Sequence, residues 1–143
     1  MNPLDMGCKC GCGRSEYNTS ILRIAMKIGQ EWEARSMTPA GTCPPLLCIT
    51  SGYRCMYYDW KINPDLNSTR QHTRGVAIDL ARIDGGSFLD KEIEWIKERA
   101  LHYGATGVGL YNRSIHIDWR EERFITNPKM INGRKVQLWD MRK

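Results

Sequence analysis

Two short stretches of the chain contain side chains that bind metal ions. The first contains His72 and, seven positions later, Asp79. The second contains His116 and, two positions later, Asp118. Two histidines and one carboxylate, with a fourth position left for water, are the ligand set of many catalytic zinc sites. We therefore predict that His72, Asp79 and His116 bind one zinc ion.

The residues around Asp79 predict a β-strand that presents this carboxylate. Side chains alternate over residues 76–81, so that Asp79 shares one face with two alanines, and three larger apolar side chains share the other face. The small alanines leave room beside the carboxylate. Gly75 precedes the strand and allows the chain to bend after His72.

The residues around His116 predict a second strand of the same kind. Residues 114–119 place His116 and Asp118 on one face and three apolar side chains on the other. If the two strands lie close together, the three predicted zinc ligands meet at one point.

Length and composition limit the classes of protein to which the chain can belong. It has 143 residues, of which 41% are hydrophobic and 26% charged, as expected of one globular domain with a core. No apolar run approaches the ~20 residues that span a bilayer, so we expect no membrane insertion. The net charge of +5 is modest. The chain lacks a basic stripe with interleaved aromatic residues, so we expect no nucleic-acid partner.

The periodicity of apolar residues predicts an α+β fold. Helices are expected over residues 18–35 and 88–103, the second capped by Ser87, and strands over 46–50, 75–82, 107–111, 114–119 and 136–139. Loops are expected over 37–41 and 56–70, and an Asn-Gly hairpin turn at 132–133. We predict a single domain over 1–143 with a small antiparallel sheet and about two main helices. Residues 1–17 form an irregular Cys/Gly-rich lobe and 121–143 form a C-terminal extension with a hairpin.

Six cysteines leave two interpretations open. They are Cys8, Cys10, Cys12, Cys43, Cys48 and Cys55. The even number permits disulfides, but the N-terminal residues lack the pattern of a secretory signal, which favours a reducing site of synthesis. The first three cysteines do not have the C-x2-C spacing of common structural zinc sites. They form either a second metal site or a cysteine-rich turn that packs on the domain. Cys48 is predicted to be a buried thiol.

Four segments together resemble the zinc D-Ala-D-Ala carboxypeptidase family. They are Ile49-Thr50-Ser51-Gly52-Tyr53-Arg54-Cys55, Gln71-His72-x-x-Gly75-x-Ala77-x-Asp79, Gly107-x-Gly109-x-Tyr111 and Ile115-His116-Ile117-Asp118-x-Arg120. That family includes phage L-alanyl-D-glutamate endolysins and shares its fold with the hedgehog signalling domain. The resemblance extends from about Cys8 to Arg120, and the tail after Arg120 lies outside it.

The resemblance implies a role for each matching residue. His72, Asp79 and His116 match the three zinc ligands. Arg54 matches an arginine that binds the substrate carbonyl or carboxylate near the metal, a task that suits the fixed charge and planar donor fork of a guanidinium. The alternative for Arg54 is a surface salt bridge.

The proton acceptor of the implied reaction is less well defined. Better-studied members of the family have Glu or Asp three residues before the last histidine, where this chain has Arg113. Asp118 is our candidate instead, because the His-x-Asp pairing recurs in the subgroup that the chain most resembles. Three roles stay open for Asp118: accepting a proton from the attacking water, orienting a zinc ligand, or pairing with Arg120 or Arg74.

Two further residues depart from the family pattern, and one histidine falls outside it. Arg70 occupies a position where the family often has Ser, and Asp59 lies near a position where it tends to have Asn. These differences leave the substrate preference open without affecting the metal ligands. His102 belongs to the second predicted helix, and we expect it at the surface or at the helix end, where the helix dipole favours a cation.

The resemblance implies hydrolysis of an amide bond in peptidoglycan stem peptides. The expected enzyme is a monomeric zinc metallopeptidase of the D-Ala-D-Ala carboxypeptidase or L-Ala-D-Glu endopeptidase type. Without a signal peptide, it would act at the cell wall after release, as a phage endolysin or a virion-associated lysin. The alternative is a catalytically inactive, zinc-stabilised binding or virion structural protein of the same fold.

Overall fold

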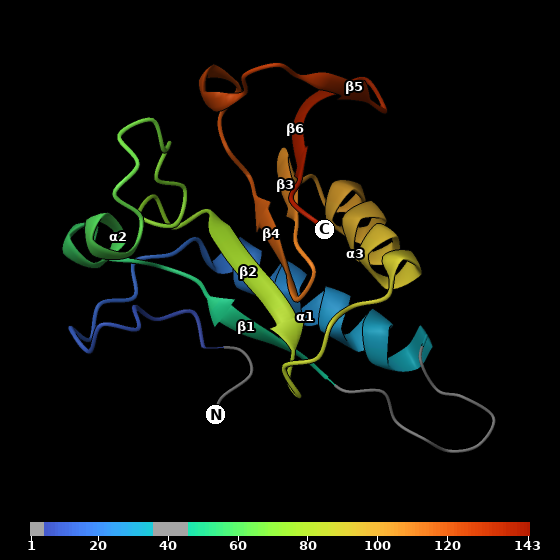
Figure 1. The fold of residues 1–143 in the computed structure, drawn as a ribbon, viewed down its shortest axis with the longest axis horizontal. Coiled ribbons are helices and arrows are strands. Elements are labelled where there is room, and N and C mark those ends of the chain that lie inside the picture. The colour runs from blue at the N-terminus through green and yellow to red at the C-terminus, as the bar shows by residue number, and fades with distance from the viewer. Residues whose placement is uncertain (1–4, 36–45) are drawn as a thin grey trace.

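The computed structural model describes residues 5–35 and 46–143 of the chain (Figure 1). Over these residues the elements are α1 (Thr19–Arg35), β1 (Leu47–Ser51), α2 (Met56–Ile62), β2 (Ala77–Arg82), α3 (Asp90–His102), β3 (Gly107–Leu110), β4 (Ser114–Asp118), the 3-10 helix η1 (Glu122–Phe124), β5 (Lys129–Ile131) and β6 (Arg134–Asp140). The loop predicted at 37–41 and Cys43 lie outside the described residues. None of the described helices has the length and apolar character needed to cross a membrane.

The strands form one open, six-stranded sheet in the order β1-β2-β4-β3-β6-β5. All neighbouring pairs are antiparallel except β3 and β6, which run parallel. The predicted α+β class is therefore confirmed, and the sheet is mostly rather than wholly antiparallel. The parallel pair arises because η1 and β5 carry the chain away from β4 before β6 returns alongside β3.

Helices α1 and α3 supply the apolar side chains that cover one face of the sheet. In Figure 1, α1 passes behind the strands. The core contains, among other side chains, Ile21, Ile28 and Trp32 of α1, Ile93 and Ile96 of α3, and Ile78, Val108, Ile115, Ile117 and Val136 of the strands. Burial of this apolar surface is the main force that holds the sheet against the helices. The opposite face of the central strands carries the polar side chains.

Two features of the helices differ from the sequence-based expectation. The segment predicted as a loop at 56–70 begins with the short helix α2. Its only buried residue is Asp59, so the sequence contains no apolar stripe that would reveal a helix. Helix α3 begins at Asp90, and Ser87 does not cap it. The Glu92 carboxylate instead accepts a hydrogen bond from the backbone N–H of Leu89 (2.8 Å).

The register of the central strands places the segment around Asp79 beside the segment around His116. Asp79 of β2 pairs directly with His116 of β4, and Ala77 pairs with Asp118. Residues that pair directly across strands point to the same face of the sheet. The predicted alternation is confirmed, because Ile78 and Ile117 point into the core while Asp79 and His116 lie on the other face.

We expect the substitution Ile117→Ala to lower the free energy of unfolding by about 2–5 kcal/mol. The side chain is fully buried, and its truncation leaves a cavity in addition to the lost apolar burial. Urea unfolding followed by circular dichroism would measure the change. The matched control is Met130→Ala in β5, where the side chain is exposed and the expected change is about 0.5 kcal/mol or less. Equal effects of the two substitutions would contradict the described core.

Candidate metal centre

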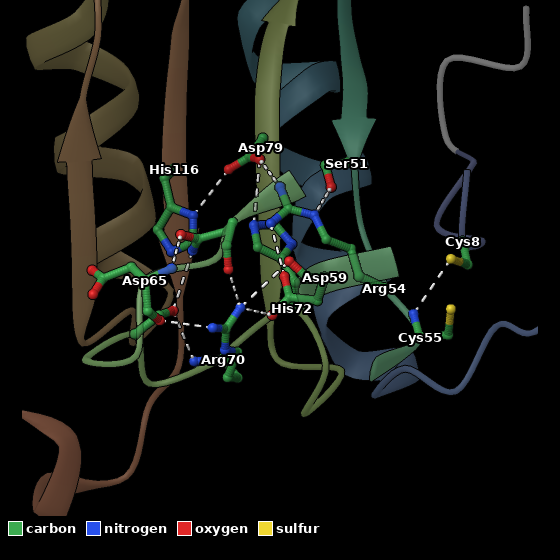
Figure 2. Close-up of polar contacts among 12 residues, drawn as sticks. Cys8, Ser51, Arg54, Cys55, Asp59, Asp65, Arg70, His72, Asp79 and His116 are labelled. Atoms are coloured by element: carbon green, nitrogen blue, oxygen red, sulfur yellow. Dashed lines mark hydrogen bonds and ion pairs between the residues drawn. The ribbon is translucent and has the colours of Figure 1, made fainter. Parts of the chain in front are cut away.

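The structure brings His72, Asp79 and His116 together. One potential ligand atom from each lies within 4.8 Å of the others. Asp79 comes from β2 and His116 from β4, while His72 comes from the turn before β2. Gly75 makes that turn possible, because its φ of +73° and the close approach of the Glu16 carbonyl leave no space for a side chain. Figure 2 shows the three side chains pointing toward one another.

Backbone contact fixes which nitrogen of His72 faces the other two residues. Its Nδ1 lies 2.7 Å from the carbonyl oxygen of Gly52. A carbonyl oxygen can only accept a hydrogen bond, so Nδ1 carries the proton and donates it. The other nitrogen, Nε2, lies 3.3 Å from Oδ2 of Asp79. In the neutral ring, Nε2 therefore has a lone pair available for a metal.

A carboxylate orients His116 in the same manner. Its Nε2 lies 2.8 Å from Oδ2 of Asp118, and its Nδ1 lies 2.9 Å from Oδ1 of Asp79. With a metal on Nδ1, Nε2 would keep its proton and donate it in a hydrogen bond to the Asp118 carboxylate. A histidine whose second nitrogen donates to a carboxylate is the usual arrangement around protein-bound zinc.

The donor set and its spacing fit a zinc ion. Zinc binds histidine nitrogen and carboxylate oxygen at about 2.0–2.2 Å in a tetrahedral arrangement, so neighbouring ligand atoms lie about 3.3 Å apart. His72 Nε2 lies 3.3 Å from Oδ2 of Asp79 and His116 Nδ1 lies 2.9 Å from Oδ1, so each histidine nitrogen is near that separation from one oxygen of the carboxylate. Because three protein ligands fill only three tetrahedral positions, a fourth stays available for water or substrate.

Electrostatic coupling between these groups is strong in the protein without metal. Burial opposes the charge on Asp79, but the neighbouring His72 and His116 outweigh it and hold the pKa of Asp79 well below its usual range. Burial likewise opposes the charge on His116, yet its hydrogen bonds to Asp118 and Asp79 raise its pKa to about 9. A proton on His116 therefore occupies the place that a metal would take.

Asp118 is fully buried and is bound on both oxygens. Arg120 donates from Nε to Oδ1 (2.8 Å) and from Nη2 to Oδ2 (2.6 Å). Burial raises the pKa of Asp118, but the hydrogen bonds from Arg120 and His116 outweigh it, and the pKa falls to about 2. The structure thus shows two of the contacts considered for Asp118, namely the pairing with Arg120 and the hydrogen bond to a predicted zinc ligand.

Arg54 lies between the predicted metal ligands and a buried carboxylate, as Figure 2 shows. Its Nη2 lies 3.3 Å from Oδ2 of Asp79, and its Nη1 lies 3.2 Å from Oδ1 of Asp59. Its Nε donates to the hydroxyl of Ser51 (3.0 Å). The pairing of Arg54 with carboxylates is therefore part of the site and is mostly buried, rather than lying on the open surface.

The two departures from the family pattern contact each other. Arg70 donates from Nη1 to Oδ2 of Asp59 (2.9 Å), and both side chains are largely buried. The guanidinium of Arg70 also lies 3.6 Å from the centre of the Trp60 ring. Since Asp59 bridges Arg70 and Arg54, a change at either departing position would affect the arginine beside the metal ligands.

A polar cavity of about 310 Å³ opens over the site. Its lining includes the three predicted ligands, Arg54, Arg70 and side chains from the segment after α2. The part of the predicted loop 56–70 that follows α2 therefore forms one wall of the cavity. The exposed Arg113, at the position where the family has an acid, is not among the lining residues.

The sequence analysis missed the contribution of the C-terminal extension to the site. Trp139 of β6 lines the cavity, and its ring centre lies 5.3 Å from that of His116. The indole Nε1 donates to the hydroxyl of Tyr111 (2.9 Å). Trp139 fits here because it pairs with Gly109, where a β-carbon would lie 2.3 Å from the indole ring. In the sequence, the only signal of this contact was Gly109, since a glycine within a strand often marks the close approach of another group.

Comparison of the chain with protein-family models, curated proteins and solved structures finds no match. The resemblance to the zinc carboxypeptidase family therefore stays a prediction from the quoted residues. The side-chain geometry described above is independent of it.

We predict that His72→Ala removes about one zinc ion per chain, because the substitution deletes one of the three protein ligands. Elemental analysis of the purified protein by mass spectrometry would measure the zinc content. His102→Ala is the matched control, since His102 lies at the end of α3 and should leave the zinc content unchanged. An unaltered zinc content in His72→Ala would contradict the site.

We also predict that a rise in pH destabilises the metal-free form while the additional stability that zinc confers increases. The raised pKa of His116, about 9 against an ordinary 6.5, stabilises the metal-free fold. That contribution is complete below pH 6.5 and is lost as the pH rises through about 9. Zinc requires neutral histidine, so the stabilisation by zinc grows over the same range.

Thermal unfolding at a series of pH values, with and without a chelator, would test this prediction. The chelated protein should lose stability from pH 6.5 to 9, and His116→Gln should remove that part of the loss. A chelated protein whose pH profile is the same with and without the substitution would be the contrary result.

Proposed function

We propose that this protein is a zinc-dependent metallopeptidase that hydrolyses peptide bonds in bacterial peptidoglycan stem peptides. The observation that carries the proposal is the convergence of His72, Asp79 and His116 in a polar cavity next to Arg54. These three protein ligands would leave one position of a bound zinc ion for water or substrate. A structural zinc site would instead be closed by a fourth protein ligand.

Zinc at this site would supply Lewis-acid chemistry, polarising a carbonyl group and lowering the pKa of a water molecule. The residues of the chain would hold the other reacting groups. Arg54 has five N–H donors, three of which are bonded to Ser51, Asp59 and Asp79. The remaining donors can bind the substrate carbonyl and stabilise the negative charge that develops on it.

Tyr111 is a second candidate for substrate contact. Its hydroxyl oxygen accepts the indole N–H of Trp139, and the O–H of the same group can donate to a substrate. Both side chains line the cavity. A rigid aromatic wall with one available donor suits the binding of a short peptide backbone.

For Asp118, the geometry supports the orienting role. Its carboxylate fixes the ring of His116 and is itself fixed by Arg120. We propose that this chain of contacts holds Nδ1 of His116 toward the metal position and keeps the imidazole in the binding tautomer.

The expected substrates contain a carboxylate beside the bond that is cut. A D-Ala-D-Ala stem ends in a free carboxylate, and a γ-linked D-Glu keeps its α-carboxylate next to the L-Ala-D-Glu bond. Arg54 presents the fixed positive charge that such a group requires. We propose on this basis a D-Ala-D-Ala carboxypeptidase or an L-Ala-D-Glu endopeptidase that acts as a monomer at the cell wall, as a phage endolysin or virion-associated lysin.

One observation favours the alternative, an inactive zinc-stabilised binding or virion structural protein. The carboxylates among the described residues lining the cavity are Asp59 and Asp79. Asp79 is a predicted ligand, and Asp59 is held between Arg54 and Arg70. Neither is an unengaged proton acceptor, and Asp118 is fully buried.

Digestion of purified peptidoglycan by the zinc-loaded protein, read by mass spectrometry of the released ends, would decide between the two. We expect new peptide ends that disappear when a chelator is added. These ends identify the bond that is cut. Absence of new ends on cell walls of several chemotypes, with zinc confirmed in the protein, would contradict the peptidase and favour the binding protein.

Substitution of Arg54 would test its part in the reaction. We expect Arg54→Lys to reduce kcat by roughly 100-fold or more with unchanged zinc content, because lysine keeps the charge but loses the planar donor fork. Arg113→Ala is the matched control and should retain full activity. If Arg54→Lys retains wild-type kcat, Arg54 has no role in stabilising the transition state.

A further inference from the structure

A second group of metal-binding side chains lies outside the cavity. The Sγ atoms of Cys8, Cys10, Cys12 and Cys55 all lie within 4.8 Å of one another. Three of these cysteines belong to the irregular N-terminal lobe, and Cys55 immediately precedes α2. The group therefore joins two segments that are more than 40 positions apart in the sequence.

The sulfur positions fit a tetrahedral metal site. Zinc binds thiolate sulfur at about 2.3 Å, which places neighbouring sulfurs of a tetrahedron about 3.8 Å apart. The distance from Cys8 Sγ to Cys10 Sγ is 3.4 Å, and that from Cys10 Sγ to Cys55 Sγ is 3.6 Å. A disulfide requires about 2.05 Å, and none of the five cysteines in the described part of the chain is in a disulfide.

The backbone of the lobe is shaped to turn its three thiols toward Cys55. The N–H of Cys8 donates to the carbonyl of Arg14 (3.0 Å), which closes the loop. Gly11, between two of the cysteines, has a φ of +89° that an L-residue rarely adopts. The N–H of Cys55 donates to Cys8 Sγ (3.3 Å), a contact that stabilises a thiolate (Figure 2).

Apart from the cysteine group, the described contacts between this lobe and the domain include those of Met6, Glu16 and Tyr17. Residues 5–17 contain no helix or strand. The N–H of Tyr53 donates to the carbonyl of Met6 (2.8 Å), and the Met6 side chain is buried. The ion pair between Lys9 and Asp5 is solvent-exposed and contributes little. The first residues of a domain are poorly ordered unless they are tied down, and a metal crosslink would do this.

We propose that Cys8, Cys10, Cys12 and Cys55 bind a structural zinc ion that anchors the N-terminal lobe to the segment 52–55. Four thiolates close the coordination sphere, so this site has no position for substrate. It differs in this respect from the triad of histidines and aspartate.

The anchored segment also supports the cavity. The carbonyl of Gly52 accepts the Nδ1 proton of His72, and Arg54 directly precedes the anchoring Cys55. In Figure 2, Cys8 and Cys55 lie beside Arg54. The cysteine site would hold these groups in place without contacting substrate. The proposal is independent of the reaction, since it concerns metal content and the order of the lobe.

Zinc content and cobalt spectroscopy of the full-length protein would test this second site. We expect about two zinc ions per chain in the wild type, and about one in both the double variant Cys10→Ser/Cys12→Ser and the variant His72→Ala/His116→Ala. The matched control is Cys48→Ala, which removes a buried thiol of β1 outside the group and should keep both ions.

Cobalt distinguishes the two sites without relying on the cysteine variants. Cobalt bound by four thiolates shows intense thiolate-to-metal charge-transfer absorption, whereas a site with nitrogen and oxygen ligands does not. We expect this absorption in the wild type and in His72→Ala/His116→Ala, so that the test stands even if the cysteine variants do not fold.

Three results would overturn the proposal. The first is the absence of thiolate-to-cobalt absorption in His72→Ala/His116→Ala. The second is a mass spectrum of protein expressed and purified under reducing conditions that still shows these cysteines paired in disulfides. The third is iron in place of zinc in the purified protein, which would assign the four thiolates to a different metal.

Discussion

The cross-strand pairing of Asp79 with His116 is the contact on which the candidate site depends. It belongs to one row of directly paired residues that runs across five strands, from Ser51 through Asp79, His116 and Gly109 to Trp139. Directly paired residues share a face of the sheet. The row therefore places a hydroxyl that holds Arg54, two predicted zinc ligands and an aromatic wall side by side, on the face opposite the helices.

The buried charges around this row are compatible with the fold only because each is paired. Asp118 is matched by Arg120 and His116, and Asp59 by Arg54 and Arg70. Desolvation of an unpaired charge would cost several kcal/mol. An apolar core on one face of the sheet and a network of paired charges on the other explain why β2 and β4 tolerate acidic side chains in the centre of the sheet.

The sequence predicted the elements that carry strong periodicity. Helix α1, the alternation in β2 and β4 and the Asn-Gly turn before β6 were all predicted from local patterns, and they placed Asp79 and His116 on the correct faces. Helix α2 was missed because its only buried residue is an aspartate. The placement of Trp139 could not be derived, since it depends on the parallel pairing of β3 with β6, a long-range contact that Gly109 alone does not specify. The approach of Cys55 to the N-terminal cysteines could not be predicted either, because it is also a long-range contact.

Anomalous diffraction at the zinc absorption edge, from crystals of the zinc-loaded protein, would test the central claim most directly. We predict a zinc ion bound by Nε2 of His72, a carboxylate oxygen of Asp79 and Nδ1 of His116 at about 2.0–2.2 Å, with water as the fourth ligand. Asp118 should contact His116 and not the metal. Absence of zinc at this position, or a fourth protein ligand that closes the site, would contradict a catalytic metal centre.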